Sequence, residues 1–159
     1  MNIKTILVAL ALLAGASVKA DSPLAPSADG QEISDSKTGL IWRRCPEGMS
    51  FSAGTCSGEA SRMNHDAAVT LAASESKRTS LPWRLPNAKE LATIADKARK
   101  DPAIDPVAFP NTPPSWFWSY SPSEGGAGYA WFIDFHDGFV QVNGNRSGSY
   151  FVRLVRSQK

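Results

Sequence analysis

Residues 116–142 contain the pattern that decides the fold. Trp116-Phe117-Trp118-Ser119-Tyr120 is followed by a polar, glycine-rich stretch, then by residues 130–136, Asp137-Gly138 and residues 139–142. The two-residue periodicity of these segments predicts three consecutive strands. Asp-Gly is a favoured dipeptide for two-residue hairpin turns, because both positions tolerate positive φ angles. We therefore expect the last two strands to form a hairpin that turns at residues 137–138.

Two segments before this run have helical spacing instead. Residues 64–77 carry Asn64 as a suitable N-cap and place an apolar stripe on one face, made of Ala67, Ala68, Leu71 and Ala72. A second helix begins after Asn87, because Asn87 and Glu90 have the spacing of a capping box. Its apolar positions, Leu91, Ile94, Ala95 and Ala98, continue toward Pro102, which is expected to stop the helix. Residues 102–114 are rich in proline and predict an irregular, extended segment.

Outside these elements, residues 39–44 predict a first strand and residues 149–156 a last one, with Tyr150, Val152 and Leu154 on one face. Residues 21–33 have few apolar anchors, so we expect a loose leader there. The order of strand, two helices and a run of strands predicts an α+β fold. We expect one domain over residues 34–159, with two helices packed on a mainly antiparallel sheet and long loops.

Composition and charge narrow the function. The 159 residues are 42% hydrophobic and 20% charged, as in one compact globular domain. The formal charge of +2 includes Lys4 and Lys19, and the chain without its first twenty residues has equal numbers of acidic and basic residues. A neutral domain lacks the positive surface that supplies most non-specific affinity for nucleic acid, so we expect no nucleic-acid partner.

The first twenty residues have the three parts of a secretory signal peptide. Lys4 precedes the apolar run 6–14, and Val18 and Ala20 occupy the −3 and −1 positions before Asp21. The apolar run is too short to span a bilayer, so no stable membrane insertion is expected. We therefore predict cleavage after residue 20 and a periplasmic or secreted protein.

The two cysteines, Cys45 and Cys56, both follow this segment. In an oxidising compartment an even pair of cysteines favours a structural disulfide. The alternatives are a metal site completed by His65, for which no fourth ligand is evident, and a redox pair, which lacks the C-x-x-C spacing.

Several segments occur in an order typical of one bacterial family. The most specific are Trp83-Arg84-Leu85-Pro86-Asn87 with Glu90-Leu91, and the closing Val152-Arg153-Leu154-Val155-Arg156. The others are Thr38-Gly39-Leu40-Ile41-Trp42 before the two cysteines, Phe109-Pro110-Asn111, residues 116–119, and Ala130-Trp131 with Phe135 and Gly138. With these segments, residues 33–156 resemble the Lcl C-terminal domain family of secreted bacterial proteins.

This resemblance implies a C-type-lectin-like fold, in which the N- and C-terminal strands pair, two helices flank the sheet and a long loop region carries the ligand site. It also implies binding of sulfated glycans and formation of trimers, which are properties of the family's named adhesin member. A glycan or protein ligand and a homo-oligomer are therefore the expected partners. The chain departs from the family at the start of its first helix, where Met63 and Asn64 replace an often-present tryptophan.

Catalytic signatures are missing from the sequence. The chain has no G-x-S-x-G motif, and neither of its two histidines lies in a known catalytic motif. The related sulfatase-modifying enzymes use a late cysteine pair, whereas no cysteine follows Cys56 here. We therefore expect a protein that is not an enzyme and needs no cofactor.

Asp134-Phe135-His136-Asp137 offers three potential metal ligands in four residues. On a strand, however, Asp134 and His136 share a face, while Asp137 belongs to the expected turn. The turn interpretation is favoured, and no metal site is expected. The Glu-Pro-Asn and Gln-Pro-Asp tripeptides of sugar-binding C-type lectins are absent, so calcium-dependent sugar binding is not supported.

The aromatic row on the 116–120 strand has two interpretations. Trp116, Trp118 and Tyr120 point to one side and Phe117 to the other. If Phe117 faces inward, the row is an exposed ladder that suits stacking on a sugar ring. If the row faces inward, it is simply core, which is the commoner fate of large aromatic residues.

The C-terminal segment also has two interpretations. Arg146, Arg153, Arg156 and Lys159 could form a small basic patch for a sulfate or carboxylate group. Alternatively, they form ion pairs with the acidic segment 101–145 or with acids near the first strand, and this alternative is favoured.

We therefore favour an exported binding module whose ligand surface combines residues 111–128 with the 143–149 loop. The candidate contacts are Trp116, Trp118, Tyr120, Asn143, Asn145 and Arg146. An accessory protein that docks on another protein is the first alternative, and a periplasmic enzyme is the second.

Overall fold

The computed structural model describes residues 22–158 and has the predicted α+β architecture, with two helices and mainly antiparallel sheets. Its strands are β1 (Leu24–Pro26), β2 (Glu32–Asp35), β3 (Leu40–Arg43), β4 (Met49–Ser52), β5 (Thr55–Gly58), β6 (Arg62–Met63), β7 (Trp116–Pro122), β8 (Tyr129–Asp134), β9 (Phe139–Asn145), β10 (Tyr150–Phe151) and β11 (Val155–Ser157). The helices are α1 (His65–Thr79) and α2 (Ala88–Ile94).

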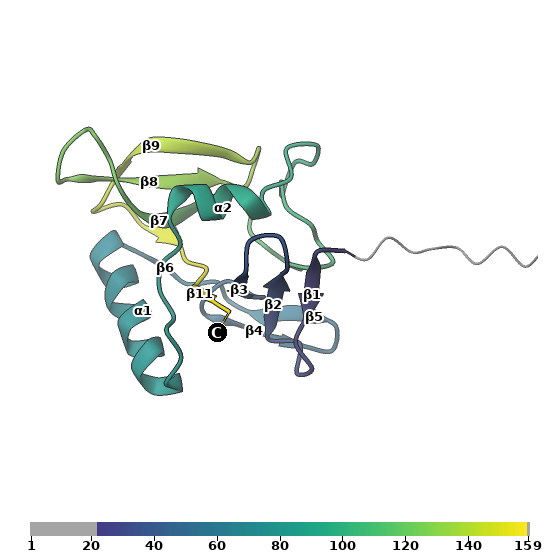
Figure 1. The fold of residues 1–159 in the computed structure, drawn as a ribbon. Helices are drawn as coiled ribbons and strands as arrows, with labels where there is room; N and C mark the ends of the chain where they lie inside the picture. Colours follow the sequence, from purple (N-terminus) through teal and green to yellow (C-terminus); the bar gives the residue numbers. More distant parts are fainter. Residues whose placement is uncertain (1–21, 159) are drawn as a thin grey trace, which may run out of the picture.

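The strands form two main sheets and a hairpin. One sheet has the order β1-β2-β3-β11, the other has the order β6-β10-β7-β8-β9, and β4 pairs with β5. All pairs are antiparallel except β10 with β7. In Figure 1, α2 lies across β7, β8 and β9, and α1 lies beside the sheets on the left. The antiparallel pairing of β3 with β11 brings the two ends of the domain together.

The N-terminal segment corrects one prediction. Residues 21–33 were expected to form a loose leader, but residues 24–26 are β1 and pair with β2. Ile33 on β2 is buried in the core. Leu24 on β1 packs against the same cluster, and backbone hydrogen bonds to β3 order the remaining residues of β2.

Both helices begin directly after their predicted N-cap residues, Asn64 and Asn87. The Asn64 side chain accepts a hydrogen bond from the Ala67 N–H, and Asn87 and Glu90 form a complete capping box. The second helix ends at Ile94, however, well before Pro102. Ala95 is extended and bridges Ile104, and the Asp96 N–H donates to the Ala103 carbonyl. Pairing with the irregular segment thus replaces the last predicted helical turn.

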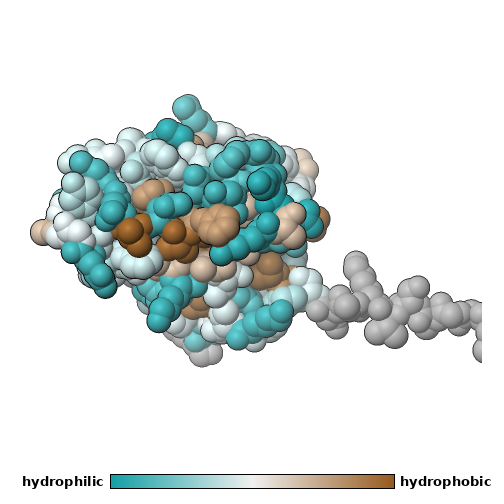
Figure 2. Space-filling view, turned by 90° about the horizontal axis from the view of Figure 1, so that it is seen from above, coloured by the Kyte–Doolittle hydropathy of each residue, from teal (hydrophilic) through white to brown (hydrophobic). Residues whose placement is uncertain are grey.

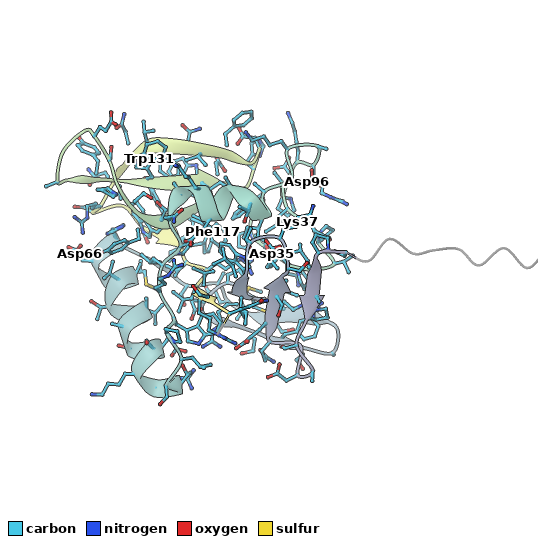
Figure 3. All side chains as sticks on the ribbon, in the orientation of Figure 1. Asp35, Lys37, Asp66, Asp96, Phe117 and Trp131 are labelled. Carbon is cyan, nitrogen blue, oxygen red and sulfur yellow. A yellow bond between two sulfur atoms is a disulfide. The ribbon has the colours of Figure 1, made fainter. Side chains whose placement is uncertain are left out.

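The core has two hydrophobic clusters on opposite sides of β7. Phe117 belongs to the cluster formed with α2 and the β1–β3 side of the molecule, and Figure 3 shows it near the centre between the two sheets. Trp118 belongs to the cluster formed with α1, Trp83 and Leu85. Val152 and Leu154 also lie in this second cluster, and Tyr150 packs against it, as the predicted shared face requires. The last strand is nevertheless split into β10 and β11 by residues 152–154.

The predicted disulfide is present, with Cys45 and Cys56 joined by an S–S bond of 2.05 Å. It connects the residues after β3 to the β4–β5 hairpin. A metal site built from these two cysteines and His65 is therefore wrong.

The β8–β9 hairpin is also corrected. Asp134 pairs with Phe139, so the connection has four residues, 135–138, and not two. The Gly138 N–H donates to the Asp134 carbonyl at 2.7 Å, and Gly138 has a φ of +79°. Phe135 is fully buried and anchors the turn in the core, and its backbone N–H and carbonyl bond to Ser115 and Ala103 and not to β9.

No helix in the described part of the chain is long and apolar enough to cross a membrane.

Candidate functional site

The three aromatic residues of the row on β7 differ in their exposure to solvent. Trp116 is 44% exposed and Tyr120 is 62% exposed, but Trp118 between them is fully buried. The Trp118 ring stacks on Tyr150 with centroids 4.0 Å apart, and its indole N–H donates to the Met63 carbonyl. Phe117 is also fully buried, so neither the exposed ladder nor the purely internal row is correct. Trp118 is a core residue and not a ligand contact.

Tyr120 leaves the row because the strand is irregular. The register of β7 against β8 shifts between Trp118 and Pro122, and the Tyr120 N–H donates to the Pro86 carbonyl at 2.8 Å. Trp116 stays with the sheet, packs on Tyr150 and Phe132, and donates its indole N–H to Asp134. Trp116 and Tyr120 therefore belong to different parts of the surface.

Tyr120 lines a cavity of about 430 Å³, which we call the Tyr120 pocket. Tyr129, which is 40% exposed, lines the same cavity. The polar side chains in its lining are those of Ser123, His65 and Arg146. Among the predicted contacts, the structure thus brings Tyr120 and Arg146 together, from positions well separated in the chain.

Arg146 is held in place by α1 and by the connection between β7 and β8. Its Nη2 forms an ion pair of 2.6 Å with Asp66 Oδ1, and its Nη1 donates to the Ala127 carbonyl at 3.2 Å. The backbone carbonyl of Arg146 accepts from the His65 N–H at 3.0 Å. Figure 3 shows Asp66 at the end of α1 that is nearest the five-stranded sheet. The positive charge of Arg146 is therefore already paired with a carboxylate.

His65 is the first residue of α1 and is buried beneath the pocket. Its Nε2 lies 2.9 Å from the Ser119 carbonyl oxygen, and its ring packs edge-on against Trp118. Burial lowers the pKa of His65, with Arg146 as a further lowering influence. The Nδ1 atom is buried and has no hydrogen-bond partner.

The two asparagine candidates lie beside the pocket. Asn143 Oδ1 accepts from the Ser123 hydroxyl at 3.3 Å and lines a smaller cavity of about 220 Å³ with Trp131, which Figure 3 shows next to β9. Asn145 Oδ1 accepts from the Ser147 N–H and so stabilises a turn. Asn143 is therefore adjacent to the Tyr120 pocket, whereas Asn145 lines neither cavity.

The C-terminal arginines do not form a basic patch. Arg153 is fully buried and donates to the carbonyl oxygens of Arg43 and Arg44 and to the Thr112 hydroxyl. Arg156 forms an ion pair of 2.5 Å with Glu32 on β2. The predicted pairing with an acid near the first strand is thus confirmed for Arg156, whereas Arg146 pairs with Asp66 of α1, which was not among the predicted partners. Lys159 lies outside the described residues.

His65, Ser123 and Tyr129 were missed as site residues by sequence reasoning. Tyr129 had one usable signal, since it is an aromatic residue directly after a polar, glycine-rich loop. His65 had none, because its position under the pocket depends on β7, which lies more than fifty residues away in the chain.

Metal binding finds no geometric support within residues 22–158, where no three His, Cys, Asp or Glu side chains are grouped to hold an ion. His136 instead pairs with Asp101 through Nδ1 at 2.5 Å, and Asp134 accepts from Trp116. The Asp137 carboxylate accepts from the Phe139 N–H, as turn residues do.

A family model described as the Lcl C-terminal domain matches residues 31–156. No curated protein matches the chain. No solved structure matches it either.

Proposed function

Because the chain belongs to the Lcl C-terminal domain family, we propose that it is an exported binding module that recognises a glycan in the Tyr120 pocket. The observation that carries this proposal is the pair of exposed aromatic rings, Tyr120 and Tyr129, on one cavity with Ser123 and Arg146. Sugar rings present an apolar face to aromatic side chains and hydroxyl groups to polar ones. A concave site with both kinds of group is therefore suited to a saccharide.

A C-type-lectin-like scaffold is part of the proposal. The pairing of β3 with β11, the two helices and the long connections over residues 95–115 and 123–128 support it. In this arrangement the sheet holds the strand ends rigidly while loops supply recognition. The Tyr120 pocket lies where the β7–β8 connection meets the residues after β9.

Export to the periplasm or beyond is also proposed. The Cys45–Cys56 disulfide supports it, since such bonds persist in oxidising compartments. The predicted signal peptide lies outside the described residues.

We propose no catalytic activity. The Tyr120 pocket contains a single histidine, whose Nε2 is engaged by a backbone carbonyl and whose Nδ1 is buried away from the pocket surface. Catalysis by a general base requires a group free to take a proton from the substrate and a nucleophile within its reach. Ser123, the one hydroxyl side chain of the pocket besides the tyrosines, donates to Asn143.

The test is an array of neutral and sulfated oligosaccharides probed with the oxidised protein lacking residues 1–20. We expect binding by the parent protein and a loss of about tenfold or more in affinity for Tyr120→Ala. Trp116→Ala is the matched control, because it removes an exposed aromatic ring outside the pocket. If the parent protein binds no oligosaccharide on the array, or if both variants lose the same affinity, the proposal is overturned.

A second candidate function, docking on a protein, is favoured by strand β9. This strand is an edge of the five-stranded sheet and exposes Phe139 and Val142. Figure 2 looks down on this side of the molecule and shows hydrophobic residues gathered in a central stripe with hydrophilic ones around it. Since β9 has no charged residue, two copies can pair antiparallel without placing like charges opposite each other.

The occupant proposed for β9 is therefore a second copy of the chain. Sedimentation velocity is expected to show a dimer that dissociates in Val142→Lys. A protein that is monomeric at high concentration would refute this use of β9 and leave the glycan proposal intact.

A further inference from the structure

Tyr120 lines a second kind of cavity besides the Tyr120 pocket. This cavity has a volume of about 200 Å³ and lies between α1 and the connection from α1 to α2, and we call it the apolar cavity. Figure 1 shows this connection running back along α1 toward α2. Besides Tyr120 and Arg84, the lining consists of apolar side chains: Val69, Ala72, Ala73, Trp83 and Leu85.

The backbone explains why Tyr120 reaches this cavity. The Tyr120 N–H donates to the Pro86 carbonyl at 2.8 Å, and the Ala88 N–H donates to Ser121 Oγ at 3.0 Å. These two bonds hold β7 against residues 86–88, the end of the connection that lines the apolar cavity. The Tyr120 ring is 62% exposed, so its surface is available to a ligand.

The two cavities are neighbours along α1. His65 lines the Tyr120 pocket and Val69 lines the apolar cavity. Residues four apart lie on the same face of a helix, one turn from each other. Because Tyr120 belongs to the lining of both cavities, one ligand that lies over its ring can occupy both.

The apolar cavity differs from the Tyr120 pocket in its chemistry. Arg84 is its one charged lining residue, and its Nη1 and Nη2 already pair with the two Glu90 oxygens at 2.8 and 2.7 Å. Val69 is partly exposed and Ala73 is exposed, so both present apolar surface to solvent. Such a surface favours an apolar group, whose transfer out of water is favourable.

We propose that the ligand of the Tyr120 pocket is a glycan that carries an alkyl or acyl chain, and that this chain passes Tyr120 and lies in the apolar cavity. This inference rests on the proposed glycan function and specifies its substrate class as an amphiphilic glycan. A water molecule takes up about 30 Å³, and a methylene group is of similar size, so the cavity holds a chain of about six carbons.

The probes are methyl, hexyl and decyl glycosides of glucose and of N-acetylglucosamine, used below the concentrations at which they form micelles. We expect the hexyl glycoside to bind at least about tenfold more tightly than the methyl glycoside. The decyl glycoside should gain no more than about twofold over hexyl, because the cavity is then full. Equal affinity for methyl and hexyl, or a gain that continues undiminished to decyl, would refute the chain subsite.

Two substitutions on α1 locate the effect. Ala73→Trp places a large ring at the apolar cavity, so the ratio of hexyl to methyl affinity should fall to about one. Ala67→Trp is the matched control, because Ala67 is exposed on the same helix and lines neither cavity, and it should keep the parent ratio. A parent-like ratio in Ala73→Trp, or an equal fall in both variants, would contradict the inference.

A direct measurement places the chain. In carbon–proton NMR spectra, the methyl signals of Val69 should shift with the hexyl glycoside and not with the methyl glycoside. Those of Val142, which lines neither cavity, should shift with neither. If no alkyl glycoside binds while the oligosaccharide array gives binding, the chain subsite alone is wrong. If the array is negative as well, the glycan function fails with it.

Discussion

Arg153 Nη2 donates a hydrogen bond of 2.7 Å to Thr112 Oγ1 at a point where both side chains are almost completely buried. The same guanidinium donates to the Arg43 and Arg44 carbonyl oxygens and lies 4.8 Å from the centre of the Phe109 ring. One side chain thus ties the proline-rich segment 102–114 to the end of β3. Arg153, which belongs to the closing family motif, therefore has a structural function.

Replacing Arg153 with alanine should lower the free energy of unfolding by about 3–5 kcal/mol, because three acceptors, one of them buried and two partly buried, lose a donor and a cavity forms. Urea unfolding followed by tryptophan fluorescence measures the change. Arg99→Ala is the control, since Arg99 forms an exposed ion pair with Asp96 and should cost less than about 0.5 kcal/mol. A loss below about 1 kcal/mol for Arg153→Ala would contradict this account.

Glu47 should make stability decrease as the pH rises. Burial raises the pKa of its carboxyl from 4.5 to about 7, against the lowering influence of Arg43, Arg153 and Arg78, while Glu75 raises it further. The native state therefore binds more protons than the unfolded state between these values, and stability is lost as the pH rises through about 7. The loss should be about 2–3 kcal/mol between pH 5 and pH 8.

Chemical unfolding of the parent and of Glu47→Gln across this pH range tests the effect. The variant cannot ionise at this position, so its stability should exceed that of the parent increasingly as the pH rises. Parallel pH profiles for the two proteins would show that Glu47 keeps an ordinary pKa.

Removing the disulfide by the double substitution Cys45→Ala and Cys56→Ala should lower stability by roughly 2–3 kcal/mol, through the greater freedom of the unfolded chain. Thermal unfolding with and without reductant provides the comparison. Reductant should lower the Tm of the parent toward that of the variant and leave the variant unchanged. Identical Tm values for the parent in both conditions would be the contrary result.

The five tryptophans should differ sharply in access to solvent. Trp42, Trp83 and Trp118 are buried, Trp131 is partly exposed and Trp116 is the most exposed. Iodide should therefore quench a minor part of the emission, and Trp116→Phe should remove most of that part. Trp42→Phe, which changes a buried ring, should leave the quenchable component in place. Quenching that survives in Trp116→Phe would mean that the aromatic row is arranged differently.

Gly144 on β9 should not tolerate a methyl group. A Cβ atom there would lie 2.7 Å from Phe132 Cδ1 and 3.0 Å from both the Ala130 carbonyl oxygen and Trp118 Cζ3. Gly144→Ala should therefore cost about 1–3 kcal/mol through overpacking. Gly128→Ala is the matched control, because a Cβ there meets nothing within 4 Å. Equal stability of the two variants would show that the sheet shifts at Gly144 to accommodate the methyl group.

The amino-acid sequence by itself determined the features that depend on near neighbours in the chain. The change from helical to two-residue periodicity gave the α+β class, and Asn64, Asn87 and Glu90 marked both helix starts, because a cap bonds to backbone only a few residues away. The disulfide followed from a single pair of cysteines.

Only the tertiary structure decided what covers each face. Periodicity places Trp116, Trp118 and Tyr120 on one side of a strand, but burial of Trp118 depends on α1 and Tyr150, and exposure of Tyr120 depends on a shift in register. The end of α2 likewise depends on pairing with Ile104. The Tyr120 pocket depends on the contacts of Asp66 with Arg146 and of His65 with Ser119. These pairs are far apart in the sequence. They produce no periodic pattern, because ion pairs and hydrogen bonds depend on distance in space and not on spacing along the chain.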